Sequence, residues 1–158
     1  MIEKFFTQRF GEIAIDPDQV LTLPEGLPGF PDCRRFVLLE GDEYAPFIWM
    51  QSLDEPDLCF VTADPLVFFP DYRIQSTRAE LASIQLTEVE KARVLVILVI
   101  PDNPAEMTAN LQGPLVVNTE KRLAKQLVLV GETYTTKHRL FPAAEAETSS
   151  PTAREPSC

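Results

Sequence analysis

Prolines interrupt this chain from end to end, and most of them stand between short runs of apolar residues. A proline inside a helix removes a hydrogen bond and clashes with the preceding turn, so this spacing leaves little room for long helices. The intervening runs are rich in Val, Ile, Phe, Thr and Leu, which favour strands. The clearest runs are Phe36–Glu40, Phe47–Gln51, Leu58–Thr62, Val94–Ile100, Leu115–Asn118 and Gln126–Val130.

Short strands at this spacing, separated by turns that contain Pro, Gly or Asp, predict a mainly β protein. The predicted architecture is a small antiparallel β-barrel-like domain. Residues 94–100 are apolar at every position, which predicts a central strand covered on both faces. The helical signal is confined to one short segment around residues 78–92, where apolar residues recur at loosely helical spacing: Leu81, Ile84, Leu86 and Val89.

Two tight turns are predicted between residues 23 and 30. Pro28 and Gly29 suit the centre of a type II turn, because Pro fixes φ and Gly tolerates a positive φ. The preceding segment, Leu23–Gly26, has Pro second and Gly fourth, which favours a type I turn. Together the turns predict a stiff loop that either closes one end of the barrel with Leu27 and Phe30 or takes part in binding.

The chain divides into a folded part and a polar tail. With 158 residues, of which 45% are hydrophobic, it is long enough for one domain with a core of its own. Residues 143–158 contain no large hydrophobic side chain and are rich in Ala, Glu, Ser, Thr and Pro. Such a segment cannot bury enough surface to offset its ordering entropy. We therefore predict a domain over residues 1–142 and a disordered tail over residues 143–158.

The charge balance narrows the classes of partner. The chain has 14 Lys and Arg against 24 Asp and Glu, a formal net charge of -10. So acidic a protein repels phosphate backbones and is not expected to bind nucleic acid directly, whereas it suits a basic protein partner. Its longest apolar run, Val94–Ile100, is far shorter than the roughly 20 residues of a spanning helix, so no membrane association is predicted. No secretion signal is recognisable in the first residues, which predicts a cytoplasmic location.

Histidine and cysteine, two residue types that often carry catalysis or bind metals, are scarce. The cysteines, Cys33, Cys59 and Cys158, form no C-x-x-C pair, so neither a disulfide framework nor a zinc site is predicted. Cys33 and Cys59 are expected to pack as small hydrophobic side chains. The one histidine, His138, has no nucleophile placed beside it by any motif, and no glycine-rich phosphate loop occurs. We predict no catalytic site, no metal site and no cofactor.

The acidic residues are concentrated in one part of the chain. Between Phe36 and Tyr72 there is no Lys or Arg. This stretch forms either an ordinary solvated surface or a face of negative potential that steers a basic protein into place. Aromatic residues in the same stretch would anchor a partner wherever they reach the surface. The acids of the stretch are Glu40, Asp42, Glu43, Asp54, Glu55, Asp57, Asp64 and Asp71.

Leu23–Phe30 has the sequence LPEGLPGF. This sequence resembles a characteristic segment of the FliW family of flagellar assembly factors, although Leu23 replaces the usual aromatic residue. Met50 and Gly113 replace a usual Leu and a usual Ala. The resemblance covers about residues 2–141, and further segments follow in the family's order: Pro46–Asp54, Phe60–Pro65, Phe69–Tyr72, Thr108–Asn118, Gln126–Leu129 and Tyr134–Leu140.

This resemblance implies a small β-barrel-like protein without enzymatic activity. Family members bind CsrA, a basic RNA-binding translational regulator, and relieve its repression of flagellin messenger RNA. They also bind flagellin, so that the flagellin level is coupled to flagellin translation. The alternative is a flagellin-specific chaperone without CsrA control, which would hold an amphipathic helix in an apolar groove. A monomer is expected in either case.

We predict that the partner surface draws on the acidic stretch. Asn110 and Asn118 are expected instead to have a structural role, bonding to the backbone at strand ends. The predicted partner-binding residues are Asp54, Glu55, Asp57, Asp64, Asp71 and Tyr72.

Overall fold

The structure is a computed structural model, which describes residues 3–131 and 133–141. The predicted tail at 143–158 lies outside the described residues. Within the described ranges, no helix is long and apolar enough to cross a membrane.

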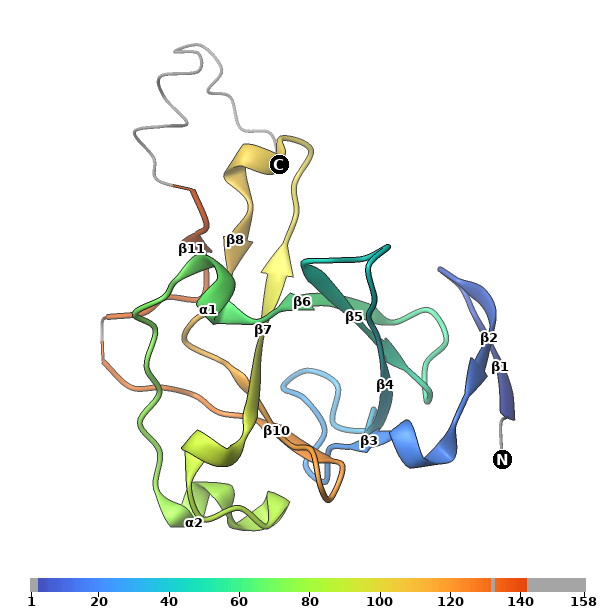
Figure 1. The fold of residues 1–158 in the computed structure, drawn as a ribbon, viewed down its shortest axis with the longest axis horizontal. Coiled ribbons are helices and arrows are strands. Elements are labelled where there is room, and N and C mark those ends of the chain that lie inside the picture. The colour runs from blue at the N-terminus through green and yellow to red at the C-terminus, as the bar shows by residue number, and fades with distance from the viewer. Residues whose placement is uncertain (1–2, 132, 142–158) are drawn as a thin grey trace.

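A closed barrel of seven strands forms the centre of the molecule (Figure 1). Neighbouring strands are antiparallel, with one exception: β3 and β10 run parallel. Pairing of β7 with β9 closes the barrel and removes the free edges that an open sheet would expose. In order around the barrel, the strands are β7 (Arg93–Val99), β6 (Cys59–Ala63), β5 (Phe47–Ser52), β4 (Arg35–Leu39), β3 (Leu21–Thr22), β10 (Leu123–Gln126) and β9 (Leu115–Asn118).

Alternation of side chains along the strands separates the inside of the barrel from its outside. On β5, Ile48 and Met50 belong to the barrel core, whereas Trp49 and Gln51 point the other way, as a period of two requires. The predicted mainly β, barrel-like fold is therefore confirmed. Phe60 of β6 packs against the buried core of the barrel. The buried core residues come from the other six barrel strands and from the loop between β3 and β4: Leu21, Leu23, Leu27, Cys33, Phe36, Ile48, Met50, Leu95, Leu115, Val117 and Ala124.

A hairpin packs against the outside of the barrel. It consists of β1 (Glu3–Thr7) and β2 (Gly11–Ile15), which form a separate sheet (Figure 1). Ile15 packs with Val37 and Leu53 in a small cluster that covers the outer face of β4 and β5. At the hairpin tip, the Arg9 guanidinium lies 4.7 Å from the centroid of the Trp49 ring.

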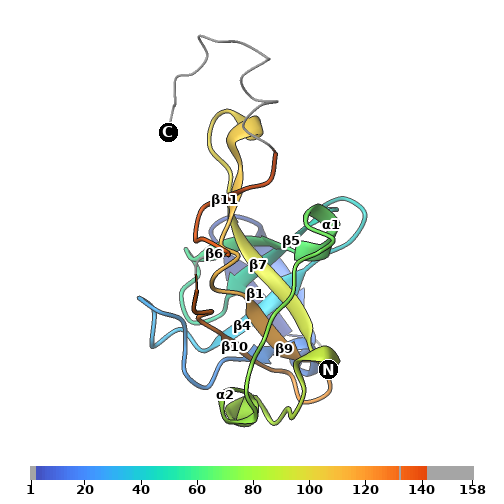
Figure 2. The same cartoon turned by 90° about the vertical axis from the view of Figure 1, so that its left-hand side faces the viewer.

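The end of β7 leaves the barrel and enters a second small sheet with β8 (Thr108–Ala109) and β11 (His138–Arg139). Figures 1 and 2 both show this extension rising above the barrel, with the short 3-10 turn η4 (Pro104–Glu106) near its top. Residues 95, 96 and 98 are buried, as expected for a central strand, but Val99 is 58% exposed because it lies beyond the barrel.

In the part of the chain that the structure describes, each helical element is only three or four residues long. The segment predicted around residues 78–92 contains α2 (Arg78–Leu81), η2 (Ala82–Ile84) and η3 (Val89–Lys91). Thr77 and Glu80 form a reciprocal capping box at the start of α2. The sequence did not indicate α1 (Pro65–Phe68) or η1 (Pro17–Gln19). Each of these begins with an Asp cap followed by Pro, a start signal too short to produce a periodic pattern.

Both predicted turns are present between β3 and β4. Gly29 has a φ of 87°, the conformation that a type II turn needs at that position, and Phe30 N donates to Leu27 O at 2.8 Å. Gly26 N donates to Leu23 O at 2.9 Å, which closes the first turn. The loop divides its two apolar residues: Leu27 enters the barrel core, while Phe30 stays 40% exposed against Phe60.

Candidate partner-binding surface

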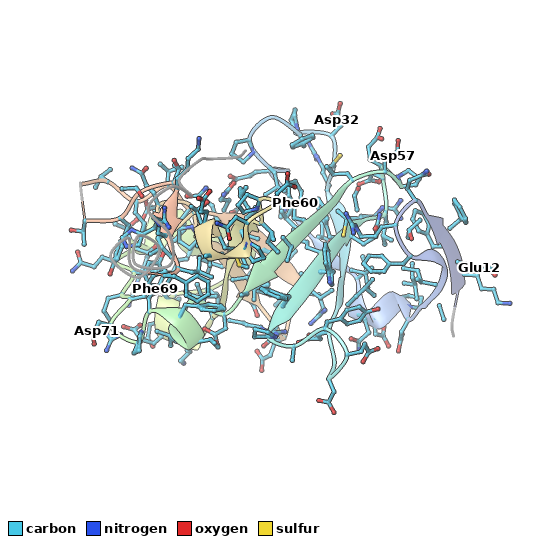
Figure 3. The ribbon with its side chains drawn as sticks, turned by 90° about the horizontal axis from the view of Figure 1, so that it is seen from above. Glu12, Asp32, Asp57, Phe60, Phe69 and Asp71 are labelled. Atoms are coloured by element: carbon cyan, nitrogen blue, oxygen red, sulfur yellow. The ribbon has the colours of Figure 1, made fainter. Side chains whose placement is uncertain are left out.

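The predicted partner-binding residues fall at two separate places. Asp54, Glu55 and Asp57 lie in the turn between β5 and β6, whereas Asp64, Asp71 and Tyr72 follow the other end of β6. Figure 3 shows the separation, with Asp57 toward the upper right of the view and Asp71 at the lower left. The structure therefore does not gather the predicted residues into one site.

The turn between β5 and β6 is built by hydrogen bonds from buried side chains. The Gln51 amide donates to three backbone carbonyls, those of Ser52, Pro56 and Leu58. The Ser52 hydroxyl accepts from the backbone N–H groups of Asp54 and Glu55. Both Gln51 and Ser52 are fully buried. The acids of this turn are thus held on a preorganised support, which lowers the entropy that binding would cost.

Asp54 is engaged within the protein. Its Oδ2 accepts from the backbone N–H groups of Arg34 (2.8 Å) and Arg35 (2.9 Å), and its Oδ1 accepts from the Arg35 guanidinium. Burial alone would raise the pKa of Asp54, but the hydrogen bonds from Arg35 and Arg34 outweigh it and hold the pKa below its usual value. Asp54 therefore ties the turn to β4 and offers little free charge to a partner.

Glu55 and Asp57 border a pocket of about 390 Å³ beside the β3–β4 loop. The loop contributes Phe30 and Asp32, and Leu58 lies beside the two acids. Figure 3 shows Asp32 and Asp57 on the same side of the molecule. Among the described residues, the side chains of Asp32, Glu55 and Asp57 make no hydrogen bond or ion pair. We call the group Phe30, Asp32, Glu55, Asp57 and Leu58 the acidic pocket.

The chemistry of the acidic pocket favours a cationic side chain with an apolar stem. Phe30 and Leu58 offer apolar surface, and three exposed carboxylates surround it. No Lys or Arg is among its described lining residues. A Lys or Arg side chain could lay its methylene groups on the apolar surface while its charge meets the carboxylates.

At the other end of β6, the acids have different roles. Asp64 caps α1, since its carboxylate accepts from Leu66 N at 2.9 Å. Asp71 is exposed at the rim of a pocket of about 320 Å³, whose walls include Phe69 and His138. The Phe69 and His138 rings meet edge to face, with centroids 5.3 Å apart.

Tyr72 is part of the core. The residue is 4% exposed, and its hydroxyl donates to Leu111 O at 2.6 Å. Burial raises the pKa of Tyr72 far above its usual value. Its ring packs on that of Tyr134, with centroids 4.6 Å apart. Tyr72 was predicted to contact a partner, but the residue is almost entirely buried and exposes little surface for such a contact.

An apolar pocket of about 370 Å³ lies between α1 and the start of β7. Its apolar lining residues include Leu66, Ile74, Val89 and Val94. Its charged lining residues are Arg73, Arg93, Asp64 and Glu90. Leu66 is 50% exposed and the neighbouring Val67 58% exposed. The Arg93 guanidinium is held by two hydrogen bonds to Glu40, at 2.7 and 3.0 Å.

The remaining polar residues support the fold. As predicted, Asn118 bonds to backbone at a strand end, since its amide donates to Ile84 O and its carbonyl oxygen accepts from Glu120 N. Asn110 accepts from Gly113 N in the same manner.

Cys33 is buried in the barrel core and Cys59 is half-buried on its outside. Over residues 3–131 and 133–141, no cluster of three or more His, Cys, Asp or Glu could hold a metal ion.

Sequence reasoning missed Asp32 as a candidate site residue, and it left open whether the loop that carries Phe30 closes the barrel or takes part in binding. Asp32 lies outside the acidic stretch 36–72, and only the fold brings it beside Asp57. The signal that could have found it was the turn sequence at residues 27–30. In this stiff turn Leu27 is buried, whereas Phe30 and the next two residues, Pro31 and Asp32, are exposed.

The similarity to known proteins extends over nearly all the residues that the structure describes. The family model described as FliW protein matches residues 4–140. The chain is 45% identical over 139 residues to the flagellar assembly factor FliW of Natranaerobius thermophilus, covering 87% of this chain and 92% of the relative. It is 40% identical over 146 residues to that of Geotalea uraniireducens, covering 92% and 89%.

The fold is also similar to a solved one. A crystal structure of the flagellar assembly factor FliW superposes with a TM-score of 0.82 at 40% sequence identity. The match covers 89% of this chain and 98% of that chain.

Proposed function

Because the chain belongs to the FliW family of flagellar assembly factors, we propose that it binds a CsrA-type translational regulator through its acidic pocket. Binding relieves the regulator's repression of flagellin messenger RNA. Flagellin binds the same protein, so that the amount of free flagellin sets how much regulator is held. The protein acts in the cytoplasm, where translation takes place, and catalyses no reaction.

The observation that carries this proposal is the acidic pocket on its preorganised turn. A CsrA-type regulator is basic because it holds RNA, and it would present cationic side chains of the kind that the pocket suits. Phe30 supplies the exposed aromatic surface around which binding energy concentrates in interfaces. Asp32, Glu55 and Asp57 supply charge that speeds encounter and fixes register.

Relief of repression follows from linkage between two binding events. If binding of this protein weakens the regulator's affinity for RNA, then bound RNA weakens the regulator's affinity for this protein by the same factor. A coupling of about 1–3 kcal/mol corresponds to roughly 5–150-fold. Repulsion between an acidic protein of net charge -10 and RNA phosphates contributes to that coupling.

Charge reversal tests the pocket directly. A variant with Asp32→Lys, Glu55→Lys and Asp57→Lys should associate with the regulator at least about tenfold more slowly at low salt. The matched control reverses Glu12, Asp42 and Glu43, exposed acids without side-chain partners among the described residues, and changes the net charge equally. If both variants slow association alike, the total charge matters and the pocket does not.

A second candidate function is a flagellin-specific chaperone without control of the regulator. The apolar pocket between α1 and β7 favours it, because Leu66 and Val67 offer exposed apolar surface beside that pocket. Replacing both by Ser should then weaken flagellin binding, while titration with the regulator gives no signal. Binding of the regulator by the wild-type protein would rule this candidate out.

A further inference from the structure

An extended segment continues β10 beyond its last paired residue. In Figure 1 the orange chain runs from β10 toward the left of the view. Leu127 N donates to Pro114 O at 2.9 Å and Leu129 N to Gln112 O at 2.8 Å. These partners keep the register that Gln126 and Leu115 set in the β9–β10 pair. Residues 127–130 are thus strand-like, and Pro114, which lacks an N–H, leaves the ladder incomplete.

The outer edge of this segment is unpaired. Alternate residues of a strand turn their backbone groups to opposite sides, so those of Val128 and Val130 point away from residues 112–114. Among residues 3–131 and 133–141, no group bonds to the backbone N–H or C=O of either valine. Val128 is 67% exposed and Val130 is 95% exposed, the highest value among the exposed large hydrophobic residues described.

Proteins usually protect such edges. Lys, Pro or a bulge on the exposed strand prevents other strands from adding to it. Residues 127–131 have the sequence LVLVG, with no charge and no Pro. The inner face of the segment is anchored, since Leu127 is buried and Leu129 packs against the cores beneath. The edge is therefore held in place while its outer groups stay open.

We propose that the edge at Val128–Val130 binds an extended segment of a partner protein, which adds as a further strand. The backbone groups dictate a strand, and the two valines favour β-branched or other apolar residues opposite them. Arg73 lines a pocket of about 300 Å³ together with Leu129 and Val130, which favours a carboxylate at the end of the partner segment. This inference is independent of the acidic pocket and would stand if the proposed function failed.

The probe is a synthetic peptide of alternating Val and Thr residues that ends in Glu, and the measurement is amide exchange by NMR. In the free protein, the Val128 and Val130 amides should exchange fast, whereas Leu127 and Leu129 should be protected by their bonds to residues 112–114. Saturating peptide should slow exchange at Val128 and Val130 at least about tenfold. A matched peptide that ends in Lys should bind more weakly because Arg73 repels it.

Two substitutions separate the contribution of the Val130 backbone to peptide binding from that of its side chain. Val130→Pro removes an N–H that no described residue accepts, so the protein itself loses no hydrogen bond. It should weaken peptide binding about tenfold or more. Val130→Thr keeps the N–H and the branched shape, and should bind as the wild type does. If Val130→Pro fails to fold, exchange in the wild-type protein decides the matter.

Three outcomes would overturn the proposal. Protection of Val128 and Val130 that rises with protein concentration, without peptide, would show that a second copy occupies the edge. Protection at all concentrations would show that the chain itself covers it. Fast exchange that persists at the highest soluble concentration of peptide would show that the edge accepts no strand.

Discussion

At the scale of single residues, position in the sequence did not reveal which acids are free. Asp54 and Asp57 lie in one run of acidic residues, yet Asp54 accepts four hydrogen bonds from Arg34 and Arg35 while Asp57 accepts none among the described residues. The cause is strand pairing, because Phe36 opposite Ser52 places Arg35 beside the turn. A count of charges along the chain cannot contain that information.

Asp54→Asn should lower stability by about 1–2 kcal/mol, because a neutral amide cannot serve all four donors. Urea unfolding at neutral pH measures the loss. The conservative control is Asp57→Asn, which should change stability by less than about 0.5 kcal/mol. Equal losses in the two variants would contradict the structural role of Asp54.

The same contacts predict how stability depends on pH. The pKa values of Glu40 and Asp54 are lowered in the folded protein, Glu40 chiefly by its hydrogen bond from Arg93. A lowered carboxyl pKa gives stability that is present above the unfolded value and lost as pH falls. Urea unfolding from pH 7 to 3 should therefore show a decline that begins near 4.5 and 3.8, the ordinary values of the two groups. Asp54→Asn should make the decline shallower.

Tyr72→Phe should cost about 1–2 kcal/mol of stability, since it leaves the buried Leu111 carbonyl without its donor. Tyr44→Phe is the matched control, because the Tyr44 hydroxyl has no hydrogen bond within the described residues. Thermal unfolding compares the two. Undiminished stability in Tyr72→Phe, together with weaker regulator binding, would place Tyr72 in the interface instead.

At the scale of elements, the sequence predicted best where pattern and local chemistry coincide. The strands β4, β5, β6, β7 and β9 follow runs of apolar and β-branched residues, and the turns at Gly26 and Gly29 follow from Pro and Gly. The β1–β2 hairpin gave no comparable signal, because Glu3, Lys4 and Glu12 interrupt its apolar residues. The parallel β3–β10 pair joins residues far apart in sequence, which no local pattern encodes.

Gly26→Ala tests the turn that shapes the acidic pocket. Gly26 has a φ of 67°, and an added Cβ would lie 2.5 Å from Pro31 O. Gly11 has a φ of 68° but open space around it, so Gly11→Ala isolates the conformational strain. Gly26→Ala should lose about 1–3 kcal/mol more than Gly11→Ala in urea unfolding. Similar losses would show that the loop yields to the added methyl group.

At the scale of the whole molecule, closure of the barrel explains how so small a domain presents several surfaces. Barrel strands need no partner at their edges, so loops and extensions are free to carry contacts. The acidic pocket, the apolar pocket beside α1 and the edge at Val128–Val130 lie on different segments, although Arg73 lines both the apolar pocket and the pocket beside the edge. A protein with separate surfaces is suited to hold one partner in response to another.

The most direct test of the central claim is a calorimetric titration against the CsrA-type regulator of the same organism. It should be run at roughly 0.05 M and 0.3 M salt, which differ strongly in screening. We expect saturable binding that weakens at the higher salt, and loss of that salt dependence in the variant with Asp32, Glu55 and Asp57 reversed to Lys. No binding at either salt, by a protein that still binds flagellin in a parallel titration, would contradict the account.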